Sequence, residues 1–595
     1  MSQRDLVQGG GSLFRDAGQD GLMHRAFLRG EGFSAEDVRR SPVIGIASSA
    51  SELNPCNAGL DELAACVKEG IRAAGGLALE FPTISISEPF TRPTSLYLRN
   101  LMSMDVEEMI RSAPIDGVVL LGGCDKTVPA QLMGAVSANK PAVMLTAGPR
   151  PVSCFKQNKD FTVDDVWPLC EARRVGEVDD ADWLELEGRI NIGVGTCNVM
   201  GTATTMAAVA EMLGFALPGS ALQGAGSATR RQLARQAGHQ IVANVKTGLL
   251  PQDLVTEASL ENAFRVVTAL GGSTNAVIHL EAIAGRAGLG IGVENFGRWS
   301  AETPYVANVR PGGAMLLADL DEAGGIPAVA NSIRHLLHTG ARTATGQTWA
   351  RTLDERVFGE HPAVAPAHVP LSERGALVML RGNLAPHGAV LKAAGTHNPA
   401  LQQHRGRAVV FDGIADLNAR IDDPDLDVDA DSILVLRGMG VLGAPGMPEV
   451  GHIPIPAKLH RAGVRDMVRL SDARMSGTST GTVVLHITPE AAAGGPLGLL
   501  RTGDEIELDV AAGSIRHFLS DEDLAARAPF SNPQQPTRGF AWLHQQHVLQ
   551  PDAGCDFDFL RAGFDGGDPG RSGPRGAAVP RPEPGPQPAR SGAAR

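Results

Sequence analysis

The feature that most constrains the fold of this chain is a change in the pattern of its apolar residues near residue 371. Before that point, short apolar runs that end in small residues alternate with stretches of helical spacing. Two examples of each are residues 42–50 and 114–122, and residues 58–74 and 203–214. Such runs are typical of buried parallel strands, and their alternation with helices indicates an α/β domain with a mainly parallel sheet. We predict this domain over residues 1–370, with the polar stretch 338–370 as a connector.

After residue 371 the chain changes to short β-rich runs separated by Gly, Pro and Asp. The runs are ALVML, RAVVF, SILVLRG, GTVVLHI and DEIELDV. Few helical patterns intervene, which favours a second domain, over residues 371–565, built as a β-barrel or sandwich. From residue 566 the composition is rich in Pro, Gly and Arg and cannot bury a core, so we predict a disordered tail over residues 566–595.

Bulk properties exclude several classes of function. The 595 residues exceed the ~250–300 at which a single core stops growing. A net charge of −13 argues against nucleic acid as the main partner, because phosphate binding needs clustered Lys and Arg. No apolar run approaches the ~18–20 residues of a membrane span, and the first residues lack the apolar core of a secretion signal. We expect a cytoplasmic protein whose seven thinly spread cysteines are reduced thiols.

Three cysteines lie in turns flanked by Gly, Pro or Asn: Cys56 in NPCN, Cys124 in GGCDKT and Cys197 in GTCNVMGTA. The last two follow VVLLGG and INIGVG, which we expect to be strands, and ligands bind where parallel strands end. Thiolates brought together there could hold a soft metal or a cluster. The alternative is that each is a small buried hydrophobe, and spacing cannot decide because no CxxC is present. The other four are left out of the candidate site: Cys66, Cys170 and Cys555, which fit packed contexts, and Cys154, which stays undecided.

Several acidic residues lie in loops that either adjoin a cysteine loop or have a similar turn-forming composition. Asp125 and Lys126 directly follow Cys124, Glu88 lies in SISEPFTRP after the β-like run TISIS, and Glu449 lies in the Gly/Pro-rich loop GAPGMPEVGHIP. Carboxylates in such loops suit a hard cation such as Mg²⁺, which prefers oxygen ligands. Each residue taken singly is more often a helix cap or a solvated charge, so the prediction depends on their combination.

A polar loop, SDARMSGTSTG (471–481), precedes the run TVVLHI, and alone it could be a simple turn or a phosphate cradle. Seven segments occur in one order along the chain: GGCDKTVPA, GTCNVMGTA, GGSTNAVIHL, RGNLAPHGAVLK, GAPGMPEVGHIPIP, VRDMVRLSDARMSGTSTGTVVLH and PEAAAGGPL. Together they closely resemble the IlvD/Edd dehydratases, from about residue 10 to residue 562. EPFTRPTSLYLRNLMSMD, CNVMGTATTMA and GCDFDFLRAG resemble the sugar-acid (aldonate) branch more than the branched-chain dihydroxy-acid enzymes.

The resemblance implies an N-terminal α/β domain, a C-terminal β-barrel-like domain, and dimers or tetramers with active sites near the subunit interface. It also implies roles for the residues that match the family's functional positions. These are Cys56, Cys124 and Cys197 as ligands of a [2Fe–2S] cluster; Glu88, Asp125, Lys126 (carbamylated) and Glu449 as the Mg²⁺ site; Ser476 as the catalytic base; and Thr478 as a weaker substrate contact.

Other motif residues are left with open interpretations. Ser273 and Asn275, in GGSTNAVIH, either bind substrate or cap a helix, whereas His279 is expected to be a satisfied core histidine. Two positions depart from the family pattern: His387, where Asp is common in GNLAPxG, and Val441, where Gly-Pro is common. Neither removes a matched ligand, so the departures bear on the exact substrate.

The implied reaction takes the C2 proton from a 2,3-dihydroxy acid and expels its 3-hydroxyl, giving a 2-keto-3-deoxy acid. A cation on the carboxylate and 2-hydroxyl would stabilise the enediolate, and an iron with an open position would bind the 3-hydroxyl. Ser476 would remove the proton. Three alternatives stay open: a dihydroxy-acid dehydratase of branched-chain amino-acid synthesis, a non-catalytic metal-binding homologue, and a zinc hydrolase that uses the cysteines.

Overall fold

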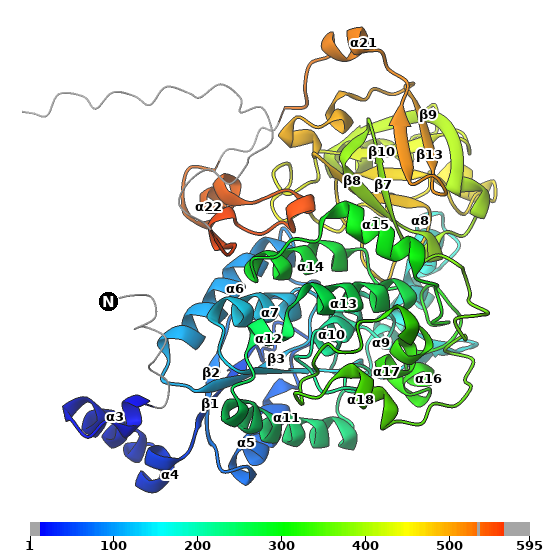
Figure 1. Cartoon of the computed structure of the whole chain (residues 1–595). Helices are drawn as coiled ribbons and strands as arrows, with labels where there is room; N and C mark the ends of the chain where they lie inside the picture. Colours follow the sequence, from blue (N-terminus) through cyan, green and yellow to red (C-terminus); the bar gives the residue numbers. More distant parts are fainter. Residues whose placement is uncertain (1–11, 532–535, 564–595) are drawn as a thin grey trace, which may run out of the picture.

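The computed structural model describes residues 12–531 and 536–563, and it consists of a parallel sheet wrapped in helices followed by a closed β-barrel (Figure 1). The predicted fold class, an α/β part followed by a barrel-like part, is confirmed. The predicted tail, 566–595, falls outside the described residues.

The sheet of the first part has the strand order β2-β1-β3-β4, and all neighbours are parallel. Its strands are β1 (Val43–Ser48), β2 (Leu77–Pro82), β3 (Gly117–Gly122) and β4 (Ala142–Thr146). Strands β1, β3 and β4 are buried along their whole length, as their unbroken apolar runs indicate. The parallel pairing places the ends of β1, β3 and β4 at one edge of the sheet, where the loops with Cys56 and Cys124 begin.

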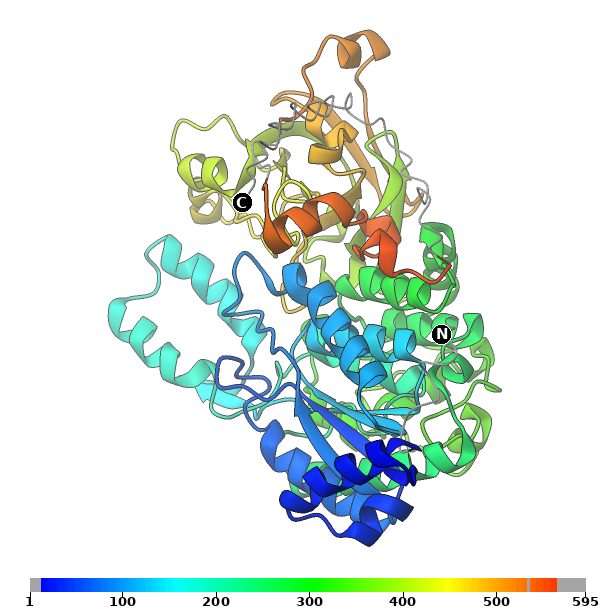
Figure 2. The same cartoon turned by 90° about the vertical axis from the view of Figure 1, so that its left-hand side faces the viewer.

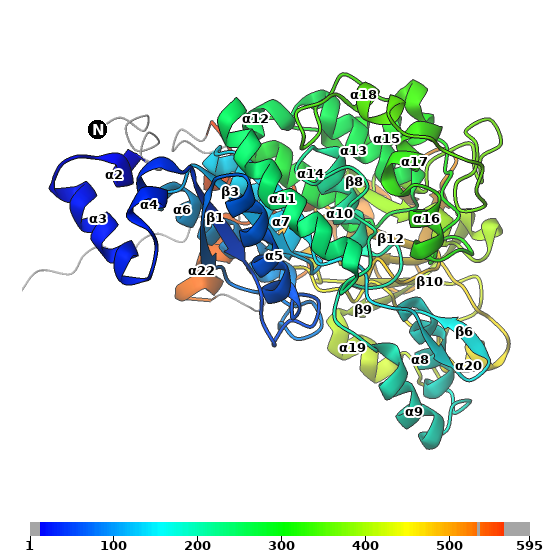
Figure 3. The ribbon, with the colours of Figure 1, turned by 90° about the horizontal axis from the view of Figure 1, so that it is seen from below.

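Helices cover both faces of this sheet (Figures 1 and 3). Alternate side chains point to opposite faces, so Val119 packs toward α5 (Leu60–Ala73) and α11 (Ala228–Thr247), while Val118 and Leu120 pack toward α6 (Ser95–Ser112) and α7 (Thr127–Ala138). Helix α11 is capped by the preceding residue, Ser227, whose hydroxyl accepts the Arg230 N–H. The strands predicted within 42–50 and 114–122 and the helix predicted within 58–74 are confirmed, whereas the β-like run TISIS (83–87) lies in the loop after β2, which ends at Pro82.

A further helical layer surrounds α10 (Thr202–Met212), α13 (Glu257–Ala269) and α14 (Asn275–Arg286), which are almost wholly buried. The remaining helices of the first part are α2 (Ser12–Arg15), α3 (Gln19–Gly30), α4 (Ala35–Arg40), α12 (Pro251–Leu254), α15 (Gly292–Glu302), α16 (Leu317–Glu322), α17 (Gly325–Ser332) and α18 (Trp349–Asp354). Trp349 is fully buried in the same core as α10 and α13. The polar stretch 338–370 therefore packs against the first part.

An excursion projects from this body (Figures 2 and 3). It contains the hairpin β5 (Ser153–Phe155) and β6 (Asn158–Phe161), followed by α8 (Val166–Arg174) and α9 (Asp180–Ile190). The run INIGVG, predicted as a strand, is instead a loop after α9. Ile192 and Val194 are 50% and 46% exposed, and Gly195 has a φ of +118°, which a strand residue does not adopt. The prediction of a strand before Cys197 is wrong: Ile190 ends α9, and in the loop that follows the apolar side chains of Ile192 and Val194 stay about half exposed.

The second part is a closed barrel with the strand order β10-β11-β12-β8-β7-β14-β13-β9. Its strands are β7 (Leu377–Gly382), β8 (Ala385–Lys392), β9 (Gln403–Asp412), β10 (Ile433–Arg437), β11 (Arg469–Ser471), β12 (Val483–Thr488), β13 (Glu505–Asp509) and β14 (Ser514–His517). Val410 and Val435 fill the interior, whereas Phe411 and Leu436 point outward to α19 (Gly413–Arg420). The five predicted β runs all lie in barrel strands.

The chain returns to the first part after the barrel. Short helices α20 (Ala457–Arg461) and α21 (Asp521–Ala525) decorate the barrel, and α22 (Gly539–His547) lies near α6 and α14 (Figure 1). Beyond α22, Asp556 forms a buried ion pair with Arg286, at 2.6 and 3.0 Å. Within the described residues, no helix combines the length and apolarity that a membrane crossing requires.

Candidate active site

An acidic cluster lies where the two parts meet. Glu88 comes from the loop after β2, Asp125 from the loop after β3, and Glu449 from the loop between β10 and α20. One carboxylate oxygen from each lies within 4.8 Å of the other two. The structure thus brings together three of the residues predicted as metal ligands, from segments more than 300 positions apart in sequence.

Lys126 lies in the middle of this cluster, at the start of α7, with its side chain fully buried. Its Nζ is 3.1 Å from Glu88, 3.5 Å from Asp125 and 2.9 Å from Glu449. Burial lowers its pKa, but the three carboxylates outweigh this and leave the pKa raised. Burial opposes ionisation of Glu88, yet Lys126 and Arg474 bring its pKa down to about 2. Burial raises the pKa of Asp125 to about 6.

Arg474 is a functional residue that our sequence reasoning missed. It is fully buried, and its Nη1 donates to Glu449 at 2.6 Å and to Asn275 Oδ1 at 2.9 Å. Its Nη2 donates to Thr94 Oγ1 at 3.0 Å, and that hydroxyl donates to Glu88 at 3.0 Å. One guanidinium thus holds two of the carboxylates. The available signal was an arginine inside the polar loop SDARMSG, between the buried strands β11 and β12.

Ser273 and Asn275 stand behind the acidic cluster, at the start of α14. The Asn275 amide donates to Thr202, Ser273 and the Met475 carbonyl at 3.0–3.2 Å, and its oxygen accepts from Arg474. Ser273 is itself hydrogen-bonded to Thr202 at 2.8 Å. Asn275 is the first residue of α14, and its backbone N–H donates to the Ser273 hydroxyl at 3.2 Å, whereas the side chain of the capping residue, Thr274, makes no such bond. Their polar atoms are occupied by protein groups, and their contact with substrate stays a prediction.

The three cysteines converge beside the acidic cluster. Cys124 lies next to Cys56, and its Sγ accepts the Glu88 N–H at 3.4 Å. Contact with Cys56, together with burial, raises the pKa of Cys124 well above its ordinary value. Burial raises the pKa of Cys197 to about 12, and the nearby charges that influence it include Asp125 and Cys124. All seven cysteines of the chain are free thiols.

Ser476 lies in the loop between β11 and β12. Its Oγ is 2.8 Å from Thr478 Oγ1, which also accepts the indole N–H of Trp167 at 2.8 Å. Trp167 belongs to α8, so the excursion contacts this loop directly. A side chain at Gly477 would lie 2.8 Å from Ser273 Oγ, so the loop approaches the start of α14 closely. The preceding residue, Met475, is bonded to Asn275, which places Ser476 next to the acidic cluster.

The donor sets fit the two inorganic groups predicted from the sequence. The carboxylates form a cage of hard oxygen donors around one point, which suits a divalent cation. The thiols are soft donors that are costly to ionise where they are buried, and a bound metal would provide the positive charge that stabilises their thiolates. The chemistry of these residues therefore accommodates both groups side by side.

Comparison with known proteins identifies the family. Two models match: the N-terminal part of dihydroxy-acid/6-phosphogluconate dehydratases over residues 41–352, and the C-terminal part over residues 363–555. The chain is 44% identical to a 6-deoxy-6-sulfo-D-gluconate dehydratase of Pseudomonas putida, with 91% of this chain and 94% of the relative aligned. The same identity and coverage hold for an L-arabinonate dehydratase of Rhizobium leguminosarum.

A dihydroxy-acid dehydratase of Saccharolobus islandicus is 35% identical, with 86% of this chain and 92% of the relative aligned. The family predicted from the sequence motifs is therefore confirmed over nearly the whole chain. This protein belongs to the dihydroxy-acid/6-phosphogluconate dehydratase family.

Proposed function

We propose that this protein removes water from a sugar acid, an aldonate such as a pentonate or hexonate, and yields a 2-keto-3-deoxy acid. The observation that carries the proposal is the acidic cluster around Lys126, with the thiols and the loop of Ser476 close to it. The relatives named for sugar-acid dehydration support the substrate class, because they are more similar to this chain than the relative named for dihydroxy acids.

Glu88, Asp125, Glu449 and a carbamylated Lys126 would hold Mg²⁺. Replacing the ammonium of Lys126 by a carbamate removes two units of positive charge, and one divalent cation restores them. The pocket would keep its net charge, so the fixed charge of Arg474 remains balanced. Bound Mg²⁺ supplies the charge that stabilises an enediolate on the substrate.

Cys56, Cys124 and Cys197 would hold a [2Fe–2S] cluster. Three thiolates would leave one of the cluster's four protein-ligand positions free for another ligand. The bound cluster supplies a Lewis-acidic iron for the 3-hydroxyl. Arg150 donates to Cys56 Sγ at 3.8 Å and would stabilise the negative charge of that thiolate.

Ser476 would take the C2 proton as an alkoxide. A serine hydroxyl is normally too weak a base, so the positive charges of the neighbouring cation site must stabilise the alkoxide. Thr478 and Trp167 orient the Ser476 oxygen through the hydrogen bonds that link them. Thr478 would also contact substrate. Ser273 and Asn275 would position Arg474 and Glu449, with a direct substrate contact as their further predicted role.

The proposal is tested with a panel of aldonates. The protein is purified without oxygen, loaded with iron, sulfide and Mg²⁺, and assayed for 2-keto acid formation against pentonates, hexonates and 2,3-dihydroxyisovalerate. We expect at least one aldonate to be turned over with a higher kcat/KM than the dihydroxy acid. Preference for the dihydroxy acid would support the branched-chain alternative, and no turnover of any acid would support a non-catalytic homologue. A colourless protein that binds zinc would contradict the cluster.

We also propose that the protein works as a cytoplasmic homodimer or homotetramer. Free thiols at all cysteines suit a reducing compartment. Apolar side chains that stand beside the cysteine loops are strongly exposed, with Leu53 at 78% and Phe90 at 58%, and a second copy of the chain would cover them. Sedimentation of the loaded protein gives the assembly size, and a monomer would contradict this expectation.

A further inference from the structure

His486 has an unusual conformation for a residue of a buried strand. It lies on β12 with a φ of +56°, in the left-handed region, at a break in the register with β8. The side chain is only 4% exposed, and neither ring nitrogen has a hydrogen-bond partner among the described residues. An unpaired buried polar group costs about 1–3 kcal/mol. An apolar side chain would avoid that cost, so the imidazole calls for a functional explanation.

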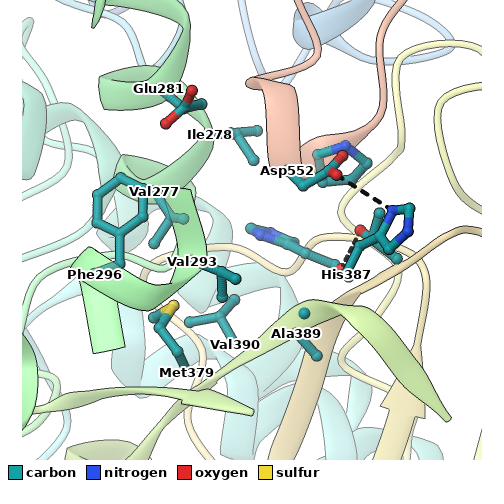
Figure 4. A pocket seen from close by; sticks show the side chains of 14 residues that line it. Val277, Ile278, Glu281, Val293, Phe296, Met379, His387, Ala389, Val390 and Asp552 are labelled. Atoms are coloured by element: carbon teal, nitrogen blue, oxygen red, sulfur yellow. Dashed lines mark hydrogen bonds and ion pairs between the residues drawn. The ribbon is translucent and has the colours of Figure 1, made fainter. Parts of the chain in front are cut away.

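A small cavity lies against His486, where α14, α15 and the barrel meet. Its volume is about 30 Å³, and a buried water needs roughly 10–15 Å³ of such space, so the cavity fits one or two waters and no metabolite. Figure 4 shows that apolar side chains, Val277, Phe296 and Met379 among them, form one side of it. On the other side lie His387 and Asp552.

The pair of His387 and Asp552 forms the outer end of the cavity. His387 Nδ1 is 3.4 Å from an Asp552 oxygen, and the side chains are 35% and 34% exposed. Burial raises the pKa of Asp552, and the charge of His387 opposes that effect. These two residues can exchange protons with solvent and with a water in the cavity.

The backbone of His486 adjoins the segment that carries Arg474: its N–H donates to the Ala473 carbonyl at 3.1 Å, and Arg474 in turn donates to Glu449. Burial, followed by the charges of Arg474 and Lys126, lowers the pKa of His486 to about 3, so the ring is neutral. The positive charges of Arg474 and Lys126 also act on His279, which lies on α14. Its Nδ1 accepts from Arg99 Nη1 at 3.1 Å, because an arginine can only donate, so its Nε2 carries a hydrogen. That N–H has no partner among the described residues. The expectation of a satisfied core histidine is therefore correct for Nδ1 and wrong for Nε2.

We propose that His486 relays protons between the dehydration site and solvent through waters in this cavity, with His387 and Asp552 at the outer end. The inference rests on the proposed function, because it concerns the protons that this reaction moves. Ser476 loses its hydroxyl proton to become an alkoxide and then takes the C2 proton. When the enol product becomes the keto acid, C3 gains a proton and the enol oxygen loses one.

In each relay step His486 gains one proton and loses one, so its ring is neutral before and after the step. One ring nitrogen of His486 accepts a proton from the site, and the opposite ring nitrogen gives its own proton to a cavity water. The water passes a proton to His387 or Asp552 and from there to solvent, and the reverse sequence returns a proton. A neutral imidazole suits this exchange because it carries one donor and one acceptor.

The fate of the C2 proton tests the relay. The loaded enzyme converts an aldonate deuterated at C2 in ordinary water, and NMR measures deuterium at C3 of the keto acid. In the wild-type protein the deuteron held by Ser476 exchanges with solvent, so we expect C3 to carry hydrogen. In His486→Leu the route is closed, the deuteron returns to C3, and most of the label is retained. His486→Gln keeps a polar side chain that cannot relay, and we expect retention there too.

His460→Leu is the matched control, since His460 is also buried and its Nδ1 has no partner within the part of the chain that the structure describes, but it lies on α20 and not on the cavity. This variant should lose the label as the wild type does. A merely structural role of His486 would lower stability or turnover without moving the label. Loss of label in both His486 variants, or its retention in the wild type, overturns the relay. No turnover of any aldonate by the wild type overturns the proposed function itself, and the relay with it.

Discussion

At the scale of single residues, the site depends on how buried charges are balanced. Lys126 and Arg474 are buried and face three carboxylates, and each positive group contacts more than one partner. An isolated charge at such depth would be costly, whereas a network of paired charges persists. The same network fixes the carboxylate oxygens before any cation arrives, which is what a selective metal site requires.

Ser476→Ala removes the proposed base and little else. We expect kcat for the best aldonate to fall about 10²–10⁴-fold, because general-base help is worth that much, while cluster absorption and thermal stability stay unchanged. Steady-state assays and visible spectra measure this. Ser479→Ala is the control in the same loop, since the Ser479 hydroxyl is buried without a partner among the described residues. Wild-type turnover by Ser476→Ala would exclude its role.

Asn275→Ala tests whether Asn275 orients the metal ligands. The side chain bonds Arg474 and reaches Glu449 at 3.4 Å, and loss of such a supporting group weakens metal binding roughly 10–100-fold. We expect the Mg²⁺ concentration for half-maximal activity to rise by that factor with a smaller change in KM for the aldonate. Asn295→Ala, on α15, should leave it unchanged. A change confined to the aldonate KM would instead indicate direct substrate contact.

The motifs that resemble the dehydratase family pointed to most of the candidate site, whereas residue types and spacing alone left the cysteines and carboxylates undecided. The three cysteines, Glu88 and Glu449 were all found through those motifs, and the structure brings them together. Arg474 escaped notice because an arginine in a polar loop looks solvated, and only the fold reveals its full burial. The sequence also could not show that ring nitrogens of His279 and His486 lack hydrogen-bond partners among the described residues, because this depends on tertiary contacts.

At the scale of elements, loops that follow strands present the ligands, and other elements brace those loops. Apolar runs predicted β1, β3 and the barrel strands correctly, since a buried strand must be apolar throughout. The same rule failed for INIGVG, where glycines and exposed side chains mark a loop. A run of apolar residues predicts a strand only where the fold supplies neighbouring strands.

Glu490 braces the loop before Glu449. It follows β12 and accepts from the N–H groups of Leu442 and Gly443 at 3.0 Å and from Gln550 at 2.7 Å. Burial, together with the negative charge of Asp472, raises the pKa of Glu490 to about 7. The unfolded chain loses this proton near pH 4.5 and the folded protein near pH 7. The folded state therefore holds the proton longer, and the unfolding free energy falls as pH rises across this window.

We expect Glu490→Gln to remove part of that fall, on the order of 1–3 kcal/mol between pH 5 and pH 7. Thermal melts of wild type and variant at the two pH values measure the difference. Glu360→Gln, at an exposed position, should leave the pH dependence as it is. An identical pH dependence in wild type and Glu490→Gln would show that Glu490 does not titrate in this range.

At the scale of the whole molecule, the site exists only because the barrel docks on the α/β part. Glu449 and Ser476 come from the barrel, while the cysteines, Glu88, Asp125 and Lys126 come from the first part (Figure 1). The C-terminal segment helps to hold this arrangement, since Arg99 donates to the Gly554 and Cys555 carbonyls and Arg286 pairs with Asp556. The sequence showed two parts, but not which surfaces meet.

Asp556→Asn tests this tie between the C-terminal segment and α14. The Arg286–Asp556 pair is fully buried, and breaking such a pair costs up to about 3–5 kcal/mol, of which Glu107, 3.4 Å from Arg286, would offset a part. We expect a clear drop in Tm, measured by calorimetry on the loaded protein, with weaker cluster retention at moderate temperature. Asp425→Asn, at an exposed position, should melt as the wild type does. An unchanged Tm for Asp556→Asn would mean that the segment contributes little to docking.

The most direct test of the central claim is anomalous diffraction from crystals of the anaerobically prepared protein, recorded at the iron edge with an aldonate present. We expect two adjacent iron peaks bounded by Cys56, Cys124 and Cys197, and a separate cation without an iron signal among Glu88, Asp125 and Glu449. The aldonate should lie between them, with C2 facing Ser476. Iron bound elsewhere, or an acidic cluster that holds no cation under these conditions, would contradict the account.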